Sequence, residues 1–156
     1  MTLVRKFPVL SKLGHLAAIL LILGLGSSTR GWAQPAAVGS LDGRWALQGS
    51  KTVFRFQPCG AATCGLLETS ERIQANPDVR DVKNPDPQLC SRRLQGLTSL
   101  EGLAPTGAAV WRGRIYLSGS GATYGLTVTH VDADTLTAKG CAAPLLCQTS
   151  TLKRLP

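Results

Sequence analysis

Residues 41–47 read Leu-Asp-Gly-Arg-Trp-Ala-Leu, and this stretch predicts a turn that leads into a short β-strand. Asp42-Gly43 is a pair typical of tight turns. Beyond it, Trp45 and Leu47 fall on one face of the strand, because side chains alternate between the two faces. We therefore expect Trp45 to be a core residue of a β-protein.

The rest of the chain repeats this pattern of short strands separated by turns. Lys51 to Gln57 places Phe54 and Phe56 on one face, and Tyr124 to Val131 carries a second apolar row in the same way. Neither an amphipathic helical period nor an internal repeat is visible. Further strands are expected at residues 64–68, 94–103, 108–111, 114–117, 135–139 and 147–155. Eight or nine short strands with regular turns predict an all-β antiparallel barrel or sandwich.

The two ends of this strand series favour the barrel. Gly43-Arg44-Trp45 at the front and Lys153-Arg154 at the back resemble the G-x-W motif and the terminal arginine of lipocalins and their calycin relatives. The resemblance implies that the arginine packs across the tryptophan and closes the base of a small antiparallel lipocalin-like (calycin) barrel. The residues expected to close the barrel are Gly43, Trp45 and Arg154.

Residues 81–97 read DVKNPDPQLCSRRLQGL and predict an ordered loop between strands. Pro85 and Pro87 disfavour a helix, because proline fixes its own φ and pushes the preceding residue toward extended backbone. We expect an acidic side chain of this loop to pair with one of its two adjacent arginines. The predicted network comprises Asp81 or Asp86 with Arg92 or Arg93, together with Asn84.

Two further expectations concern the same loop. Leu89, Leu94 and Leu97 should anchor its ends to the core. A calcium loop is the alternative use of its acidic and amide side chains. The sequence argues against calcium, because the prolines stiffen the loop and no bidentate glutamate follows at the required spacing.

The loop also resembles part of a bacterial family catalogued as domain of unknown function 2147, in the pattern D-x-K-N-P-D-P…L…R-x-L-x-G-L. The resemblance covers nearly the whole chain after the predicted cleavage at Ala33 and implies an exported, periplasmic, lipocalin-like barrel without established chemistry. Two positions depart from the family pattern, since Gln95 replaces a cysteine and Leu152 replaces a tryptophan. The other matching segments are residues 43–45, Cys59 with Cys64-Gly65, residues 111–116, 121–124 and 135–137, and Gly140-Cys141.

The N-terminal residues have the three parts of a secretory signal peptide. Basic residues precede an apolar run from Leu16 to Leu25, and a small-x-small site ends at Ala33. The apolar run is too short for a membrane span, which needs about 20 residues. We expect cleavage after Ala33, no transmembrane span afterwards, and a periplasmic or secreted product. The predicted organisation is a signal peptide at 1–33, a flexible lead-in at 34–40 and one barrel domain at 41–156.

The net charge after cleavage gives no nucleic-acid signal. The chain has 17 Lys and Arg and 9 Asp and Glu, and residues 1–33 hold four of the basic residues and none of the acidic ones. The remaining balance of 13 basic against 9 acidic residues is +4. Since there is no basic run interleaved with aromatic residues, nucleic acid is not an expected partner.

All five cysteines lie in the part that we expect to be exported, where thiols oxidise. Five cysteines allow fifteen patterns with two bridges, and the sequence does not formally decide among them. Local spacing favours Cys59–Cys64 and Cys141–Cys147, because each pair flanks a short turn, and Cys90 is then free. These spacings do not suit a zinc site, and only His130 remains after cleavage, so no metal or cofactor is expected.

A catalytic triad would have to use His130, which lies on an apolar strand face, so a hydrolase is disfavoured. The preferred hypothesis is a non-enzymatic barrel that binds an apolar or amphipathic small molecule or lipid. The alternative is a structural or interaction module of the bacterial cell envelope, with a filled barrel and a loop at residues 69–93 that contacts an envelope protein. Cavity volume distinguishes the two. The expected pocket residues are Phe54, Phe56, Trp111, Tyr124, Leu126 and Val128.

Overall fold

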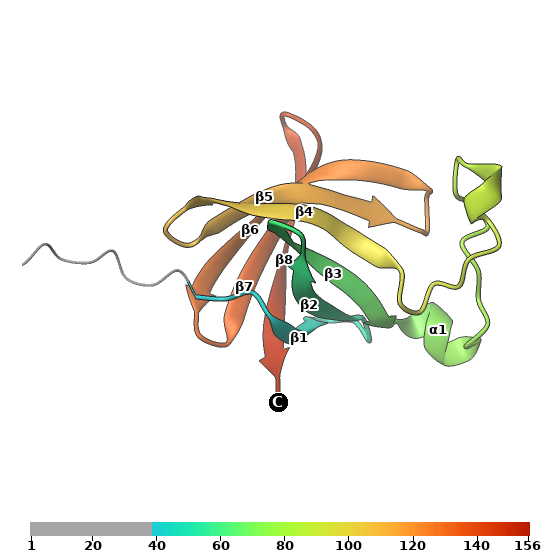
Figure 1. Cartoon of the computed structure of the whole chain (residues 1–156), viewed down its shortest axis with the longest axis horizontal. Helices are drawn as coiled ribbons and strands as arrows, with labels where there is room; N and C mark the ends of the chain where they lie inside the picture. Colours follow the sequence, from blue (N-terminus) through green and yellow to red (C-terminus); the bar gives the residue numbers. More distant parts are fainter. Residues whose placement is uncertain (1–38) are drawn as a thin grey trace, which may run out of the picture. The chain divides into compact units, whose positions relative to one another are not determined.

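Eight antiparallel strands form a closed barrel in the computed structural model, which describes residues 39–156. Each strand pairs with the next one along the chain, and the first strand also pairs with the last (Figure 1). The prediction of an all-β, antiparallel, lipocalin-like barrel is confirmed. The strands are β1 (Gly43–Leu47), β2 (Val53–Cys59), β3 (Ala62–Thr69), β4 (Thr98–Gly107), β5 (Val110–Leu117), β6 (Ala122–Asp132), β7 (Thr135–Ala143) and β8 (Leu146–Leu155).

The predicted signal peptide at residues 1–33 and most of the predicted lead-in lie outside the described residues. Both therefore stay predictions. The described residues belong to one compact unit. None of the helices in this part of the chain is long and apolar enough to cross a membrane.

Several strand boundaries differ from those expected from the sequence, and two of the differences involve a glycine. The strand expected at residues 94–103 begins only at Thr98, because Gly96 adopts a positive φ of 80° and the chain turns there. The segments expected at 108–111 and 114–117 are one continuous strand, β5, that passes through Gly113. A Cβ atom at Gly113 would lie 2.4 Å from the carbonyl oxygen of Glu101. Glycine at this position therefore permits close approach of β4 and does not end the strand.

The barrel has two different ends. The end that holds the β2–β3, β4–β5 and β6–β7 turns and the C-terminus is called the closed end. The end that holds the β1–β2, β5–β6 and β7–β8 turns is called the open end. Large apolar side chains fill the closed half of the interior. The core residues with at most 1% exposure in that half are Trp45, Leu103, Val128, Leu136 and Leu152.

Trp45 and Arg154 join the first and last strands at the closed end. Their Cα atoms are register partners, and the Arg154 guanidinium carbon lies 4.2 Å from the centre of the Trp45 ring. The indole Nε1 donates a hydrogen bond of 2.8 Å to the carbonyl oxygen of Leu41. A Cβ atom at Gly43, where φ is 118°, would lie 2.9 Å from Arg154 Nη1, so glycine makes room for the guanidinium. Leu152, which is fully buried, occupies the position where the family pattern has tryptophan.

Candidate functional site: a cavity at the open end of the barrel

A cavity of about 980 Å³ occupies the open half of the barrel. The part of its wall that the strands form is apolar. Inward-facing side chains from β2, β3, β4, β5, β6 and β8 contribute Phe54, Leu67, Leu100, Ile115, Leu126 and Leu152. Buried apolar walls of this kind are typical of small-molecule pockets, whose volumes are roughly 300–1,000 Å³.

The cavity exists because β7 and β8 present small or polar side chains to the interior in this half. Leu136 and Leu152 fill the closed half, but the next inward positions toward the open end are Ala138 and Ser150. Gly140 follows on β7, and a Cβ atom there would meet only the Ile115 side chain, at 3.9 Å. The step from leucine to alanine, serine and glycine leaves the space unfilled.

The expected pocket residues divide between the two halves. Phe54, Tyr124 and Leu126 line the cavity. Phe56, Trp111 and Val128 do not line it, although they are buried in the interior. They lie nearer the closed end of their strands. Strand alternation gives the face of a side chain but not its depth in the barrel, so the sequence did not separate the two groups.

Some wall residues were missed by sequence reasoning. Leu67 follows another leucine, so alternation did not decide which of the two faces inward. Leu100 belongs to β4, whose pairing with β3 shifts register near this position. A shift of one residue moves side chains to the opposite face, so period-two reasoning was weakest there. The signal that could have found both residues is a high local density of leucine.

The mouth of the cavity is polar on one side. Among the described residues that line it, only Glu71 and Arg72 are charged, and both lie in α1 (Glu71–Ala75). The Glu71 carboxylate accepts a 2.7 Å hydrogen bond from the backbone N–H of Lys51, and this bond lowers the pKa of Glu71. Arg72 Nη1 donates to the carbonyl and hydroxyl oxygens of Ser118 at 3.4 and 3.5 Å. These are long contacts, so most donors of the guanidinium stay available to an anionic group at the mouth.

The opposite side of the mouth is apolar and is formed by the β7–β8 hairpin. A disulfide joins Cys141 to Cys147, which are register partners with Cα atoms 4.0 Å apart. The turn beyond it exposes Leu145 and Leu146, and both also line the cavity. The second predicted disulfide, Cys59–Cys64, links β2 to β3 beside their turn at the closed end.

The segment from residue 70 to 97 packs beside the β5–β6 hairpin at the open end. It contains α1 and the short 3-10 helix η1 (Pro87–Leu89). Contact with the hairpin is close, since a Cβ atom at Gly121 would lie 1.9 Å from the carbonyl oxygen of Lys83. Leu94 and Leu97 are buried as expected, but Leu89 is 38% exposed, because it ends η1 on the outer side of the segment.

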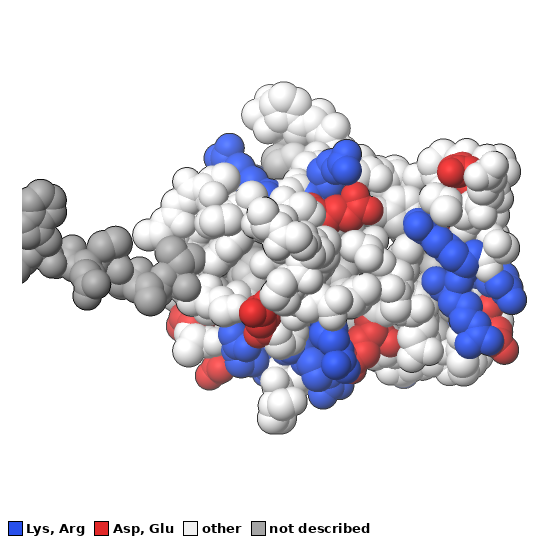
Figure 2. Space-filling model, in the orientation of Figure 1, with Lys and Arg blue, Asp and Glu red and all other residues white. Residues whose placement is uncertain are grey.

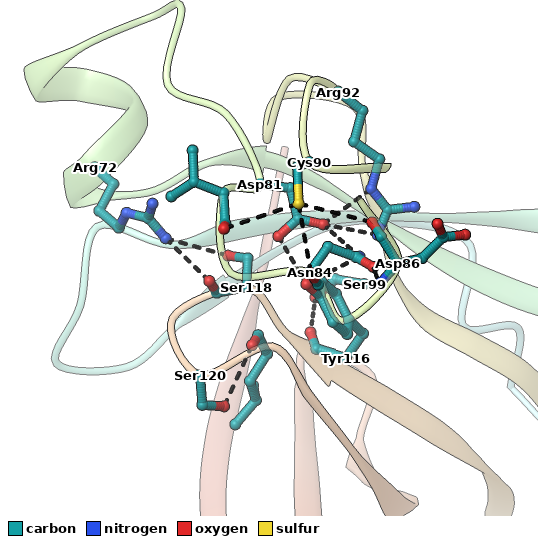
Figure 3. A network of polar contacts seen from close by, with 12 residues as sticks. Arg72, Asp81, Asn84, Asp86, Cys90, Arg92, Ser99, Tyr116, Ser118 and Ser120 are labelled. Carbon is teal, nitrogen blue, oxygen red and sulfur yellow. Dashed lines mark hydrogen bonds and ion pairs between the residues drawn. The ribbon is translucent and has the colours of Figure 1, made fainter. Parts of the chain in front are cut away.

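Asp81 is the centre of the polar network in this segment and is fully buried (Figure 3). Its Oδ1 accepts a 2.7 Å hydrogen bond from the Tyr116 hydroxyl on the outer face of β5. Its Oδ2 accepts from Asn84 Nδ2 at 2.9 Å and from Arg92, whose Nη2 lies at 2.8 Å. Burial and the neighbouring carboxylate raise the pKa of Tyr116. Every oxygen of the buried carboxylate therefore has a donor, and the network fixes the segment to the barrel wall.

The other residues expected in this network lie apart from the buried carboxylate. Arg93 forms an ion pair with Asp78 on the surface. Asp86 caps η1, because its Oδ1 accepts from the backbone N–H of Gln88 at 2.9 Å. Cys90 is a free cysteine, and its Sγ lies 3.4 Å from the carbonyl oxygen of Asn84.

His130 lies at the closed end between two tryptophans. The centres of the Trp45 and Trp111 rings are each 5.9 Å from the centre of the imidazole. Its Nε2 is buried and has no hydrogen-bond partner among the described residues. No serine or acidic side chain bonds to the imidazole there, and residues 39–156 hold no group of three or more His, Cys, Asp or Glu placed to bind a metal ion.

Comparison with known proteins supports the fold. A solved structure described as "Protein HP1028 from the human pathogen Helicobacter pylori belongs to the lipocalin family" superposes with a TM-score of 0.68. The identity is 21%, over 76% of this chain and 84% of that one, so this likeness concerns the fold alone. No curated protein matches the sequence.

The sequence itself matches one family over most of the barrel. Residues 43–154 fit the family described as "Uncharacterized protein conserved in bacteria (DUF2147)". The match extends from the glycine before Trp45 to Arg154 and so includes both strands that close the barrel. The chain therefore belongs to this family of bacterial proteins.

Proposed function

We propose that this barrel binds one apolar or amphipathic small molecule in its open-end cavity and catalyses no reaction on it. The observation that carries the proposal is the cavity of about 980 Å³ with its wall of leucine, isoleucine and phenylalanine side chains. Burial of apolar ligand surface releases about 25 cal/mol per Å², so a wall of this kind supplies binding free energy without charge pairing. The alternative of an envelope module with a filled interior does not account for a cavity of this size.

The polar mouth indicates how an amphipathic ligand would lie. Its apolar part would occupy the space beside Ala138 and Gly140, and its polar end would remain near Arg72 and Ser118. A carboxylate or phosphate could accept from the free guanidinium donors, since arginine binds such groups well. A fatty acid or a lysophosphatidic acid has this combination of a long apolar chain and a single anionic end.

Export is part of the same proposal. Two disulfides within one small barrel suit an oxidising compartment such as the periplasm, where thiols are not kept reduced. The sequence pattern of residues 1–33 supports this location independently. A binding protein in that compartment would carry an amphiphile through water.

The experiment is a titration of delipidated protein (residues 34–156) with a fluorescent fatty acid. The test variant is Gly140→Leu, which places a side chain in the cavity. The matched control is Gly125→Leu on the neighbouring strand, where the side chain would point outward and no atom lies within 4 Å of a built Cβ. We expect saturable 1:1 binding in the wild type and the control, and a loss of at least about ten-fold in affinity in Gly140→Leu. Equal affinity in all three proteins would refute the cavity as the binding site.

A further inference from the structure

The β7–β8 hairpin exposes two leucines at the mouth of the cavity. Leu145 is 95% exposed and Leu146 is 70% exposed, the highest values among the large apolar side chains of the described residues. Leu117, on the neighbouring β5–β6 hairpin, is 42% exposed. The hairpin projects from the body of the barrel in Figure 1, and its tip carries no charged side chain in Figure 2.

The hairpin holds its leucines in this exposed position. Ala143 pairs with Leu146, so Pro144-Leu145 is a two-residue turn. The Cys141–Cys147 disulfide lies directly behind that turn and links the two strands. A short turn, a proline and a covalent cross-link leave the tip little freedom to fold back onto the barrel. The hairpin therefore holds two leucine side chains in water, where their exposure is unfavourable.

Basic side chains lie beside the same mouth. Lys51 lies in the β1–β2 turn and contacts α1 through its backbone, Arg72 lines the cavity, and Lys83 abuts the β5–β6 hairpin at Gly121. None of the three forms an ion pair among the described residues. Glu71 is the acidic side chain of the mouth, and its carboxylate is bound to a backbone N–H. Figure 2 shows further basic side chains over the 70–97 segment, together with a few acidic ones.

We propose that the open end docks on an anionic lipid bilayer, with Leu145 and Leu146 inserted among the lipid chains. Exposed leucines and unpaired basic side chains are the two elements that hold peripheral proteins on such a surface. Docking in this orientation turns the cavity mouth toward the membrane. Passage of a ligand between bilayer and cavity rests on the proposed function, whereas docking itself does not.

The closed end lacks this combination. Val131 is also exposed there, at 59%, but its neighbours on the adjoining turn are Asp132 and Asp134, which an anionic surface would repel. Val131 therefore provides a control for apolar exposure alone. The choice of a lipid surface over a second copy of the chain follows from the charges, because two basic mouths would repel one another.

The experiment is sedimentation of the protein (residues 34–156) with vesicles of phosphatidylcholine and phosphatidylglycerol. We expect binding that weakens at high salt and on pure phosphatidylcholine. Leu145→Ser/Leu146→Ser should reduce the partition coefficient by about ten-fold or more per leucine, and Val131→Ser should leave it unchanged. Equal binding of the double variant and the wild type, or no binding of the wild type, would overturn the proposal. So would light scattering that shows a dimer dissociated by the double variant, because a second copy would then cover the tip.

The fatty-acid titration separates this proposal from the proposed function. Lys51→Gln/Lys83→Gln changes two side chains outside the cavity lining, so it should bind a soluble fluorescent fatty acid with wild-type affinity while it sediments less with vesicles. Gly140→Leu should lose affinity for the fatty acid and still sediment with vesicles as the wild type does. If Lys51→Gln/Lys83→Gln sedimented as the wild type does, the basic side chains would not hold the protein on the anionic surface, and the docking proposal would be wrong.

Discussion

The guanidinium of Arg154 lies over the ring of Trp45, 4.2 Å from its centre, and joins the last strand of the barrel to the first. The guanidinium also donates to the carbonyl oxygens of Asp42 and Ala133, at 2.9 and 3.0 Å. One side chain therefore ties the entry to β1, the end of β8 and the β6–β7 turn together. The contact between Arg154 and Trp45 helps to fill the closed end with packed side chains, so the cavity opens at the other end.

The first prediction concerns that closure. Trp45→Ala should lower the free energy of unfolding by about 3–5 kcal/mol, as expected for truncation of a fully buried aromatic residue. Arg154→Ala should lower it as well, and in the double variant the two losses should overlap by about 0.5–2 kcal/mol, the range for a cation–π contact. Urea denaturation measures all four proteins of the cycle. Strict additivity would mean that the two side chains do not stabilise each other.

The second prediction concerns the buried carboxylate. Asp81→Ala leaves Arg92 and the Tyr116 hydroxyl without their acceptor and should cost about 3–5 kcal/mol, as for a buried ion pair that loses one partner. Asp78→Ala removes an exposed ion pair with Arg93 in the same segment and should cost less than about 1 kcal/mol. Similar losses for both would show that the Asp81 network does not anchor the segment.

A third prediction concerns acid stability. Glu68 lies on β3 and accepts hydrogen bonds from Arg44 and Arg55, and these bonds lower its pKa. A group whose folded pKa is below its unfolded value, about 4.3, stabilises the fold above that pH and loses this contribution as the pH falls through the folded pKa. The stability of Glu68→Gln should therefore depend less steeply on pH below about 4.5. Parallel curves for the variant and the wild type would contradict the assignment.

A fourth prediction concerns the thiols. The denatured but unreduced protein should react with one equivalent of a thiol reagent, at Cys90. Cys141→Ser/Cys147→Ser should lower stability by about 2 kcal/mol, the chain-entropy value for so short a loop. Peptide mapping checks the first statement directly, and a bridge that includes Cys90 would disprove it.

A fifth prediction concerns the polar mouth. Arg72→Gln should weaken binding of a fatty acid several-fold and leave binding of the corresponding fatty alcohol nearly unchanged, because only the carboxylate would use the guanidinium. Lys139→Gln, which removes an exposed charge outside the cavity lining, is the control for net charge. An equal loss for acid and alcohol in Arg72→Gln would place the polar end of the ligand elsewhere.

The sequence predicted the barrel well, because period-two alternation is strong in strands such as β6. Tyr124, Leu126 and Val128 all face inward as expected. Alternation could not show that Val128 lies in the packed core of the closed end whereas Tyr124 and Leu126 face the cavity. That difference depends on which neighbouring strands present leucine and which present alanine, glycine or serine at the same level.

The loop illustrates a second limit. Asp81 was one of two candidate acids, and the geometry selects it because Tyr116, 35 positions later on β5, supplies a donor at a buried site. No local pattern joins these two residues. Arg92 and Arg93 are adjacent in sequence but point to different partners, so their roles depend on the direction of the backbone at the bridge between Arg80 and Arg93.

Ligand binding in the cavity is tested most directly by native mass spectrometry of protein purified without delipidation from the exporting cell. We expect a single bound adduct on the wild type and on Gly125→Leu, and none on Gly140→Leu, whose new side chain would occupy the cavity. An adduct of equal abundance on Gly140→Leu would place the ligand outside the cavity. No adduct on any of the three proteins, together with no saturable fatty-acid binding by the delipidated wild type, would show that the barrel does not bind an amphiphile in its cavity.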